Sequence, residues 1–236
     1  MWRGWGMPRV ARTRRHEHPL LAMPRRDVAV TAVAGVLTAA IFIAAAYHTT
    51  MEGLQRIDSA FLRTMISVRS GPFTACAKVL NALGLVYVTL PVRVVIAGFL
   101  AWRRRWWHVA AFVVPVVVSE IAIGRLKALY DRPRPPGSLV ATSGSSFPSG
   151  HAVAATVTVV AAVIALFPEG RLRYWWGAAA VAFSLLMGLS RSYLAAHWLS
   201  DAVGGLLLGT SITLLSALVV HAIRERVAPE VEREPT

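Results

Sequence analysis

Long apolar runs that are nearly free of charge recur along this chain of 236 residues. A bilayer-spanning helix needs about 20 such residues, and a soluble domain usually carries about 25% charged residues. Here only 16% of the residues are charged, whereas 56% are hydrophobic. The sequence therefore predicts an all-α, polytopic membrane protein with six transmembrane helices, at about Val28–Tyr47, Leu83–Trp102, 107–125, Ser149–Phe167, Tyr174–Ser190 and Leu199–Ile223.

The sequence divides into an arm, one domain and a tail. Residues 1–26 contain seven arginines and little that could form a core, so we expect a disordered cytoplasmic arm. This arm either lies on anionic lipid headgroups or serves only as a topology signal. Residues 27–227 are expected to form the six-helix transmembrane domain, and residues 228–236 a short cytoplasmic tail.

Two segments inside the domain are too polar to cross a membrane. In residues 48–72, apolar side chains recur near helical spacing, which predicts an amphipathic helix at the outer membrane surface. These side chains are Ile57, Phe61, Leu62, Met65 and Ile66. Residues 126–148 are rich in Pro, Gly, Ser and Arg and predict a polar loop on the same face. Within the second span, Arg93 is costly unless paired, and Glu120 of the next span is a candidate partner.

The distribution of basic residues predicts the orientation in the plasma membrane. With six spans, both termini share one side with the turns at 103–105 and 171–173, and that side carries 15 of the 25 Lys and Arg residues. Basic residues concentrate on the cytoplasmic side, so we expect both termini there. Several other cations cluster on the extracytoplasmic face, against this bias, and we expect a ligand to account for them; they are Arg125, Lys127, Arg132, Arg134 and Arg191.

Charge pattern and cysteine content argue against a nucleic-acid-binding face, an internal disulfide and a cysteine-based zinc site. The net charge of +13 would suit a nucleic-acid-binding protein, but no soluble module presents a basic face interleaved with aromatic residues. We therefore expect no nucleic-acid partner. A single cysteine, Cys76, excludes an internal disulfide and a Cys-based zinc site.

Three short clusters between residues 125 and 201 have the composition of a phosphate site. Lys127, Arg134 and Arg191 supply a point charge and two planar forks that suit phosphate oxygens. Taken singly, each is explained equally well as a residue facing lipid headgroups. Ser149 is a natural N-cap, and Gly150 lets another group approach the backbone closely. Free N–H groups at such a helix start bind anions.

Two histidines and one carboxylate complete the clusters. His197 and Asp201 are four residues apart and share a face if the segment is helical. A carboxylate that hydrogen-bonds one imidazole nitrogen leaves the other free as nucleophile or base. Arg191 and His197 would lie on different faces of a continuous helix, so we expect a break around Ser192–Ala196. A lone histidine is often a packing residue, but His151 at the same depth argues against that interpretation.

The three clusters resemble the signature of the type-2 phosphatidic acid phosphatase family. That signature reads Lys, six residues, Arg-Pro; then Pro-Ser-Gly-His; then Ser-Arg, five residues, His, three residues, Asp. Every spacing is kept here, over about a third of the chain, at Lys127…Arg134-Pro135, Pro148–His151 and Ser190-Arg191…His197…Asp201. The six-span layout also agrees with the family's membrane branch.

The resemblance implies a role for each of these residues. His197 would attack phosphorus and form a phosphohistidine, with Asp201 holding its ring. His151 would protonate the leaving oxygen and then activate water. The phosphate oxygens would be bound by Lys127, Arg134, Ser149, Gly150 and Arg191. The family works without a metal or other cofactor, and Asp131 alone would be a poor magnesium site.

The expected function is therefore hydrolysis of a membrane lipid phosphate at the outer face. Undecaprenyl diphosphate is the favoured substrate, because a site on this face meets that lipid where its diphosphate is released. Phosphatidic acid, phosphatidylglycerol phosphate and diacylglycerol pyrophosphate are the alternatives. Two rivals from other classes are a vanadium haloperoxidase-like oxidoreductase, which six apolar spans disfavour, and a non-catalytic lipid-binding protein, which would not need the two histidines.

Overall fold

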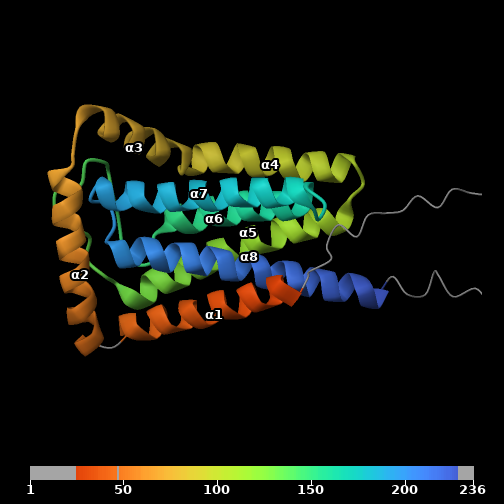
Figure 1. Ribbon diagram of the computed structural model, residues 1–236, viewed down its shortest axis with the longest axis horizontal. Coiled ribbons are helices and arrows are strands. Elements are labelled where there is room, and N and C mark those ends of the chain that lie inside the picture. The colour runs from red at the N-terminus through yellow and green to blue at the C-terminus, as the bar shows by residue number, and fades with distance from the viewer. Residues whose placement is uncertain (1–24, 47, 228–236) are drawn as a thin grey trace, which may run out of the picture.

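The computed structural model describes residues 25–46 and 48–227, and all regular secondary structure within them is helical (Figure 1). The helices are α1 (Arg25–Ala46), α2 (His48–Ser67), α3 (Gly71–Leu83), α4 (Val86–Trp102), α5 (Trp106–Tyr130), α6 (Gly150–Leu166), α7 (Arg171–Tyr193) and α8 (Leu199–Val227). The predicted all-α fold is confirmed for this part of the chain. Most of the predicted arm and tail lies outside the described residues.

Most helices run along the long axis of the molecule, and α2 lies across one end (Figure 1). Helix α6 packs against α5, α7 and α8, and α8 also packs against α1. Glycines let α6 and α8 approach closely, as small residues do in membrane bundles. A Cβ on Gly205 would lie 2.8 Å from the backbone oxygen of Ser149, and one on Gly209 would lie 3.0 Å from Cβ of Thr156. The start of α6 is thereby held against α8.

The helices differ in their capacity to cross a membrane. By length and composition, α5, α7 and α8 are long and apolar enough, and α3 with α4 adds a fourth span if this pair counts as one. Helices α3 and α4 are bent by 53° at the break around Gly84. The apolar parts of α1 and α6 are shorter, at Ala29–Ala40 and Gly150–Leu166. The described residues thus contain three or four spans by this criterion, where the sequence predicted six.

Helix α2 is the helix predicted between the first two spans. Its apolar side chains do not form one buried stripe, because Ile57 is 59% exposed and Ile66 is 45% exposed. The buried side chain on this helix is instead Asp58, which faces the bundle. The Asp58 carboxylate therefore ties α2 to the rest of the fold, together with Met65, which packs against the buried cluster that contains Ala77 and Tyr193.

Arg93 and Glu120 form the ion pair for which they were candidates, with 2.7 Å between Nη1 and Oε1. The same guanidinium donates to Thr158 Oγ1 at 2.9 Å and to the backbone oxygen of Ala154 at 3.3 Å, both on α6. These bonds offset the cost of placing an arginine within an apolar helix. They also tie α4 and α5 to the helix that carries His151.

Candidate active site

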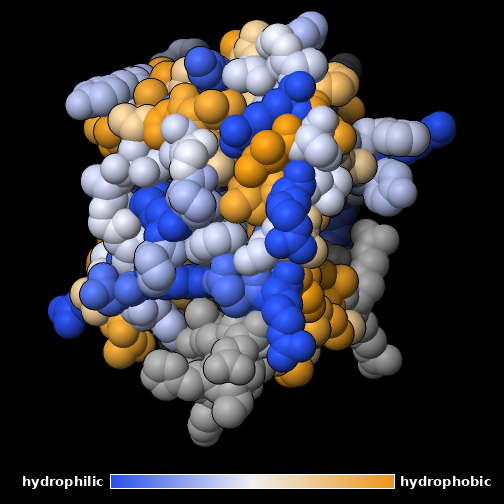
Figure 2. All heavy atoms as spheres, turned by 90° about the vertical axis from the view of Figure 1, so that its left-hand side faces the viewer, coloured by the Kyte–Doolittle hydropathy of each residue, from blue (hydrophilic) through white to orange (hydrophobic). Residues whose placement is uncertain are grey.

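The three sequence clusters meet at the end of the bundle that α2 covers. The end of α5, the start of α6, the end of α7 and the start of α8 all lie there (Figure 1). Figure 2 faces this end and shows hydrophilic side chains gathered on it. The predicted break after Arg191 is present, because α7 ends at Tyr193 and α8 begins at Leu199. Ala195 turns the chain with a left-handed φ of 52°.

His197 lies in this turn, and its contacts define one tautomer. Nδ1 is 2.7 Å from the backbone oxygen of Ser146. A carbonyl oxygen can only accept, so Nδ1 carries the proton and Nε2 keeps its lone pair. Nε2 receives a hydrogen bond from Arg134 Nη1 at 3.2 Å. Burial lowers the pKa of His197 to about 4, although nearby Asp201 opposes this effect. At neutral pH the ring is therefore uncharged, as a nucleophile or base would require.

The sequence interpretation expected Asp201 to hold the His197 ring by a hydrogen bond, but the two side chains lie slightly too far apart for one. Asp201 Oδ2 is 3.6 Å from His197 Nδ1, which exceeds the usual length of such a bond. The difference arises because His197 precedes α8 instead of lying within it, and because other donors occupy the carboxylate. Arg132 Nη1 lies 2.5 Å from Oδ1, the backbone nitrogen of Trp198 donates to Oδ2 at 2.8 Å, and Ser146 Oγ also donates to Oδ2.

The three predicted phosphate-binding cations have no carboxylate partner among the described residues. Lys127 Nζ donates to the backbone oxygen of Ser145 at 2.7 Å, and Arg191 donates to the side-chain oxygen of Asn81. Arg134 donates to backbone oxygens at 2.7 to 3.2 Å, which belong to Ser143, Gly144, Ser145 and Ala196. Burial lowers the pKa of Arg134. Three cations around one imidazole are thus left to bind an anion.

The start of α6 adds polar groups to the same site. Ser149 is the N-cap, and its Oγ accepts from the backbone nitrogen of Ala152 at 3.5 Å, a long bond. A Cβ on Gly150 would lie 3.9 Å from Lys127 Cε, so this glycine lies beside the lysine. His151 Nε2 is buried without a hydrogen-bond partner in the described structure, and so is Arg191 Nε. Buried polar atoms are rarely left unpaired, which indicates a site that a ligand completes.

The structure adds Ser146 and Asn81 to the site and corrects the expectation for Arg132. The sequence places Arg132 among the cations expected to bind a ligand, but this arginine pairs with Asp58 and Asp201 instead. Arg132 binds Asp201, Ser146 binds both Asp201 and His197, and Asn81 binds Arg191. The Arg-Pro-Arg sequence at 132–134 contained a signal for Arg132. In an extended segment the side chains of residues 132 and 134 lie on the same face, so both arginines can reach one site. Asn81 carried only a weak signal, as a lone amide in an apolar helix.

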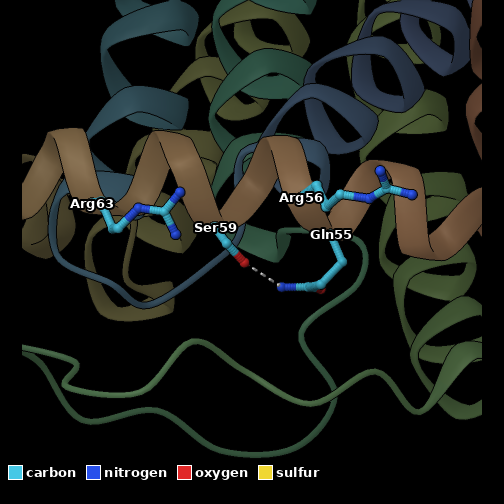
Figure 3. A pocket seen from close by; sticks show the side chains of 4 residues that line it. All are labelled: Gln55, Arg56, Ser59 and Arg63. Atoms are coloured by element: carbon cyan, nitrogen blue, oxygen red, sulfur yellow. Dashed lines mark hydrogen bonds between the residues drawn. The ribbon is translucent and has the colours of Figure 1, made fainter.

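Apart from the site, a hollow of about 540 Å³ lies beside α2 (Figure 3). Its lining consists of Gln55, Arg56, Ser59 and Arg63, and Gln55 donates to Ser59 Oγ at 3.2 Å. None of the predicted site residues lines this hollow. Gln55 connects this hollow to the site, because its Oε1 accepts from Arg132 at 3.1 Å.

His151 is expected from the sequence to take part in catalysis. On that expectation, replacing Gly84 with alanine should lower kcat by about 10²-fold, because a small displacement of a reacting group has effects of this size. A Cβ on Gly84 would overlap His151 Cδ2, so the imidazole would have to move. The matched control is Gly98→Ala on α4, where a Cβ meets nothing within 4 Å. Steady-state phosphate release and thermal melting of both variants test this. Equal kcat values would contradict the packing of His151 against the α3–α4 break.

Comparison with known proteins places this chain among membrane lipid phosphatases. The model of the PAP2 superfamily matches residues 104–225, which include all the predicted site residues. Phosphatidylglycerophosphatase B of Bacillus subtilis is 28% identical over 194 residues, covering 79% of this chain and 92% of that protein. An undecaprenyl-diphosphatase of Sulfolobus acidocaldarius is 28% identical over 148 residues, covering 59% of this chain and 67% of that protein.

A solved structure is also similar to most of this chain. The crystal structure of a transmembrane PAP2-type phosphatidylglycerolphosphate phosphatase from Bacillus subtilis superposes with a TM-score of 0.70 and 26% identity. The match covers 85% of this chain and 98% of that one. The predicted family and the predicted enzyme class, a phosphatase, are confirmed. With more than half of its length matched, this chain belongs to the PAP2 superfamily.

Proposed function

We propose that this protein is a metal-independent lipid phosphatase that acts through a phosphohistidine. The observation that carries the proposal is that Lys127, Arg134 and Arg191 lack carboxylate partners in the described residues, while Nε2 of His197 keeps its lone pair and accepts a hydrogen bond from Arg134. Phosphoryl transfer depends mainly on positioning and on stabilising charge at the equatorial oxygens. Lys127, Arg134 and Arg191 supply that charge without a metal ion.

In the first half-reaction, His197 Nε2 forms a bond to phosphorus, and the bond between phosphorus and the lipid oxygen breaks. The negative charge of the bound phosphate favours the protonated form of His151. His151 gives its proton to the lipid oxygen, so the lipid leaves as a neutral alcohol or, from a diphosphate, as a lipid monophosphate. The phosphorylated ring carries positive charge, which the backbone oxygen of Ser146 and the nearby carboxylate of Asp201 stabilise.

In the second half-reaction, His151 removes a proton from water and the water oxygen attacks phosphorus. The bond between Nε2 and phosphorus breaks, inorganic phosphate leaves, and both histidines return to their starting states. The backbone N–H groups at the start of α6, with Ser149 and Gly150, bind the phosphate oxygens beside Lys127.

An apolar groove supports a lipid as the substrate. This groove lies between α4 and α5, has a volume of about 520 Å³, and begins at Val86, two residues after the glycine that touches His151. Its walls are mostly apolar and include five valines, with the Arg93–Glu120 pair among them. A phosphate bound by Lys127 and Arg191 would leave its hydrocarbon tail next to this groove.

Filling the groove should discriminate between substrates with long and short tails. Val94 lines the groove and is 61% exposed, whereas the adjacent Val95 is 69% exposed and does not line it. We expect Val94→Trp to raise KM roughly tenfold for a long-tail lipid phosphate and to leave a short-tail analogue unchanged. Val95→Trp should change neither value. An equal change in KM for both variants and both substrates would mean that tryptophan acts through the surrounding lipid and does not fill a substrate groove.

Two lipid classes are candidate substrates. Phosphatidylglycerol phosphate is the first, because the relative of that activity aligns with most of this chain and the solved structure of that activity shares its fold. Undecaprenyl diphosphate, the sequence-based expectation, is the second and is supported by the Sulfolobus relative. Phosphate release in detergent with EDTA, across these two lipids, phosphatidic acid and diacylglycerol pyrophosphate, tests the function. Release that requires a divalent cation, or no release at all, would contradict it.

We further propose that six segments cross the plasma membrane, with the site on the extracytoplasmic side and both termini in the cytoplasm. In this arrangement α1, α3–α4, α5, α6, α7 and α8 are the spans, and α2 lies along the outer surface. The arginine distribution supports it. Thr142→Cys in a Cys76→Ala background should react with a membrane-impermeant thiol reagent in intact cells. Reaction only after cell lysis would reverse the orientation.

A further inference from the structure

Arg132 lies between two buried carboxylates that belong to distant parts of the chain. Its Nη1 is 2.5 Å from Asp201 Oδ1, and its Nη2 is 2.7 Å from Asp58 Oδ2 on α2. The Arg132 side chain is 5% exposed, and those of Asp58 and Asp201 are 1% and 0% exposed. Such a buried arrangement is favourable only when the geometry satisfies every charged group.

The remaining bonds of this cluster meet that condition. Arg132 Nη1 also donates to Ser200 Oγ at 2.7 Å. Asp58 accepts from the backbone nitrogen of Ser200 at 2.8 Å and from its Oγ at 2.6 Å. Asp58 therefore holds both the guanidinium and the first turn of α8, which directly follows His197. The bond from Arg132 Nη2 to Gln55 completes the contacts with α2.

Arg132 and Arg134 have different tasks although one proline separates them. Arg134 donates to backbone oxygens and to His197 Nε2 and has no carboxylate partner in the described residues. Arg132 is neutralised by two carboxylates, so little of its charge remains for a phosphate. A role of Arg132 in direct phosphate binding is thus disfavoured by its own contacts.

We propose that Arg132 is a positioning residue, anchored by Asp58 of α2, that holds Asp201 and sets the electrostatic environment of His197. The inference rests on the proposed role of His197 as nucleophile. It makes α2 a part of the active site and gives Asp58 an indirect role in catalysis. Neither residue belongs to the motifs that identified the site.

The net charge of the cluster of Arg132, Asp58 and Asp201 predicts the direction in which the pKa of His197 should move in each variant. Two carboxylates and one guanidinium carry a net charge of −1 in the native protein. Arg132→Met makes this −2, Asp58→Asn makes it 0, and the double variant restores −1. The other charged or titratable groups facing His197 are Arg134, Arg191 and His151, and all three are unchanged in these variants. A more negative cluster favours the protonated imidazole.

The test is the titration of His197 followed by ¹⁵N NMR of the full-length protein in detergent, with His197→Asn used to assign its signals. Arg132→Met should raise the pKa of the imidazole by about one pH unit, since removal of a nearby charge has effects of this order. The double variant Arg132→Met/Asp58→Asn should return the pKa close to the native value. The pH below which kcat/KM falls should likewise rise in Arg132→Met and return close to the native value in the double variant.

Arg56→Met is the matched control for charge. It removes one arginine from α2, the helix that carries Asp58, at an exposed position in the hollow beside that helix, where solvent screens its field (Figure 3). We expect the His197 titration to stay in place in this variant. Thermal melting of each variant reports any loss of folding separately.

Several results would overturn the proposal. If Arg132→Met and the double variant titrate like the native protein, Arg132 is only a structural residue. If KM rises and the titration is unmoved, Arg132 binds phosphate directly. The NMR titration needs no substrate, so it decides the role of Arg132 even if none of the lipids is hydrolysed, an outcome that would contradict the proposed function alone.

Discussion

Replacing His197 with asparagine should lower phosphate release by roughly 10⁴-fold or more, the order expected when a nucleophile is removed. Asparagine keeps an N–H donor near the position of Nδ1, which binds the backbone oxygen of Ser146, but it has no group in place of Nε2. The change therefore removes the attacking atom and leaves the local bonds largely intact. Initial rates of phosphate release from each lipid measure the loss.

The covalent intermediate provides the sharper measurement. A phosphohistidine survives alkaline quenching, so the native protein should retain label from a ³²P-labelled lipid and His197→Asn should retain none. His221→Asn is the matched control, because His221 lies near the far end of α8, 3.3 Å from Glu225. It should retain the native rate and the native label. Undiminished phosphate release by His197→Asn would mean that water attacks the lipid phosphate directly.

The sequence predicted which side chains meet, because the motifs fix their spacing and chemistry. Placing Arg191 and His197 in one pocket required a break in the helix, and the chain does break between Tyr193 and Leu199. The Arg93–Glu120 pair followed from depth in the membrane and from the cost of an unpaired arginine. These predictions needed only periodicity and the low tolerance of the bilayer for charge.

The partners of these side chains could not be predicted in the same way. Asn81 binds Arg191 across 110 positions of sequence, and Gly84 touches His151 from the break between α3 and α4. No local pattern connects such residues, because tertiary packing alone brings them together. The Ser146 backbone oxygen that binds His197 Nδ1 is likewise invisible in a sequence, since every residue carries a carbonyl group.

Helix α2 illustrates a limit of amphipathic patterns. The spacing of its apolar residues correctly predicted a helix, but Ile57 and Ile66 are exposed and Asp58 is buried. A buried carboxylate is stable only with partners, and those partners, Arg132 and Ser200, lie far along the chain. The pattern therefore predicted the type of element without showing which face packs on the site.

Replacing His151 with asparagine should slow turnover of a lipid phosphate by about 10²–10⁴-fold, the range for loss of a general acid–base group. His151 Nε2 is buried, unpaired in the described structure and set at the start of α6, beside the expected phosphate position. Its loss should affect the two half-reactions differently, depending on the leaving group. A lipid alkoxide needs a proton to leave, whereas para-nitrophenolate does not.

With para-nitrophenyl phosphate, His151→Asn should therefore form the phosphoenzyme at nearly the native rate and hydrolyse it slowly. Rapid-mixing experiments should show a burst of para-nitrophenol close to one equivalent per protein, and alkaline-stable label should accumulate. The native protein should show a smaller burst, because His151 also speeds the second half-reaction. If His151→Asn instead slows both substrates equally and gives no burst, the residue does not protonate the leaving group, and its packing against Gly84 would be its main role.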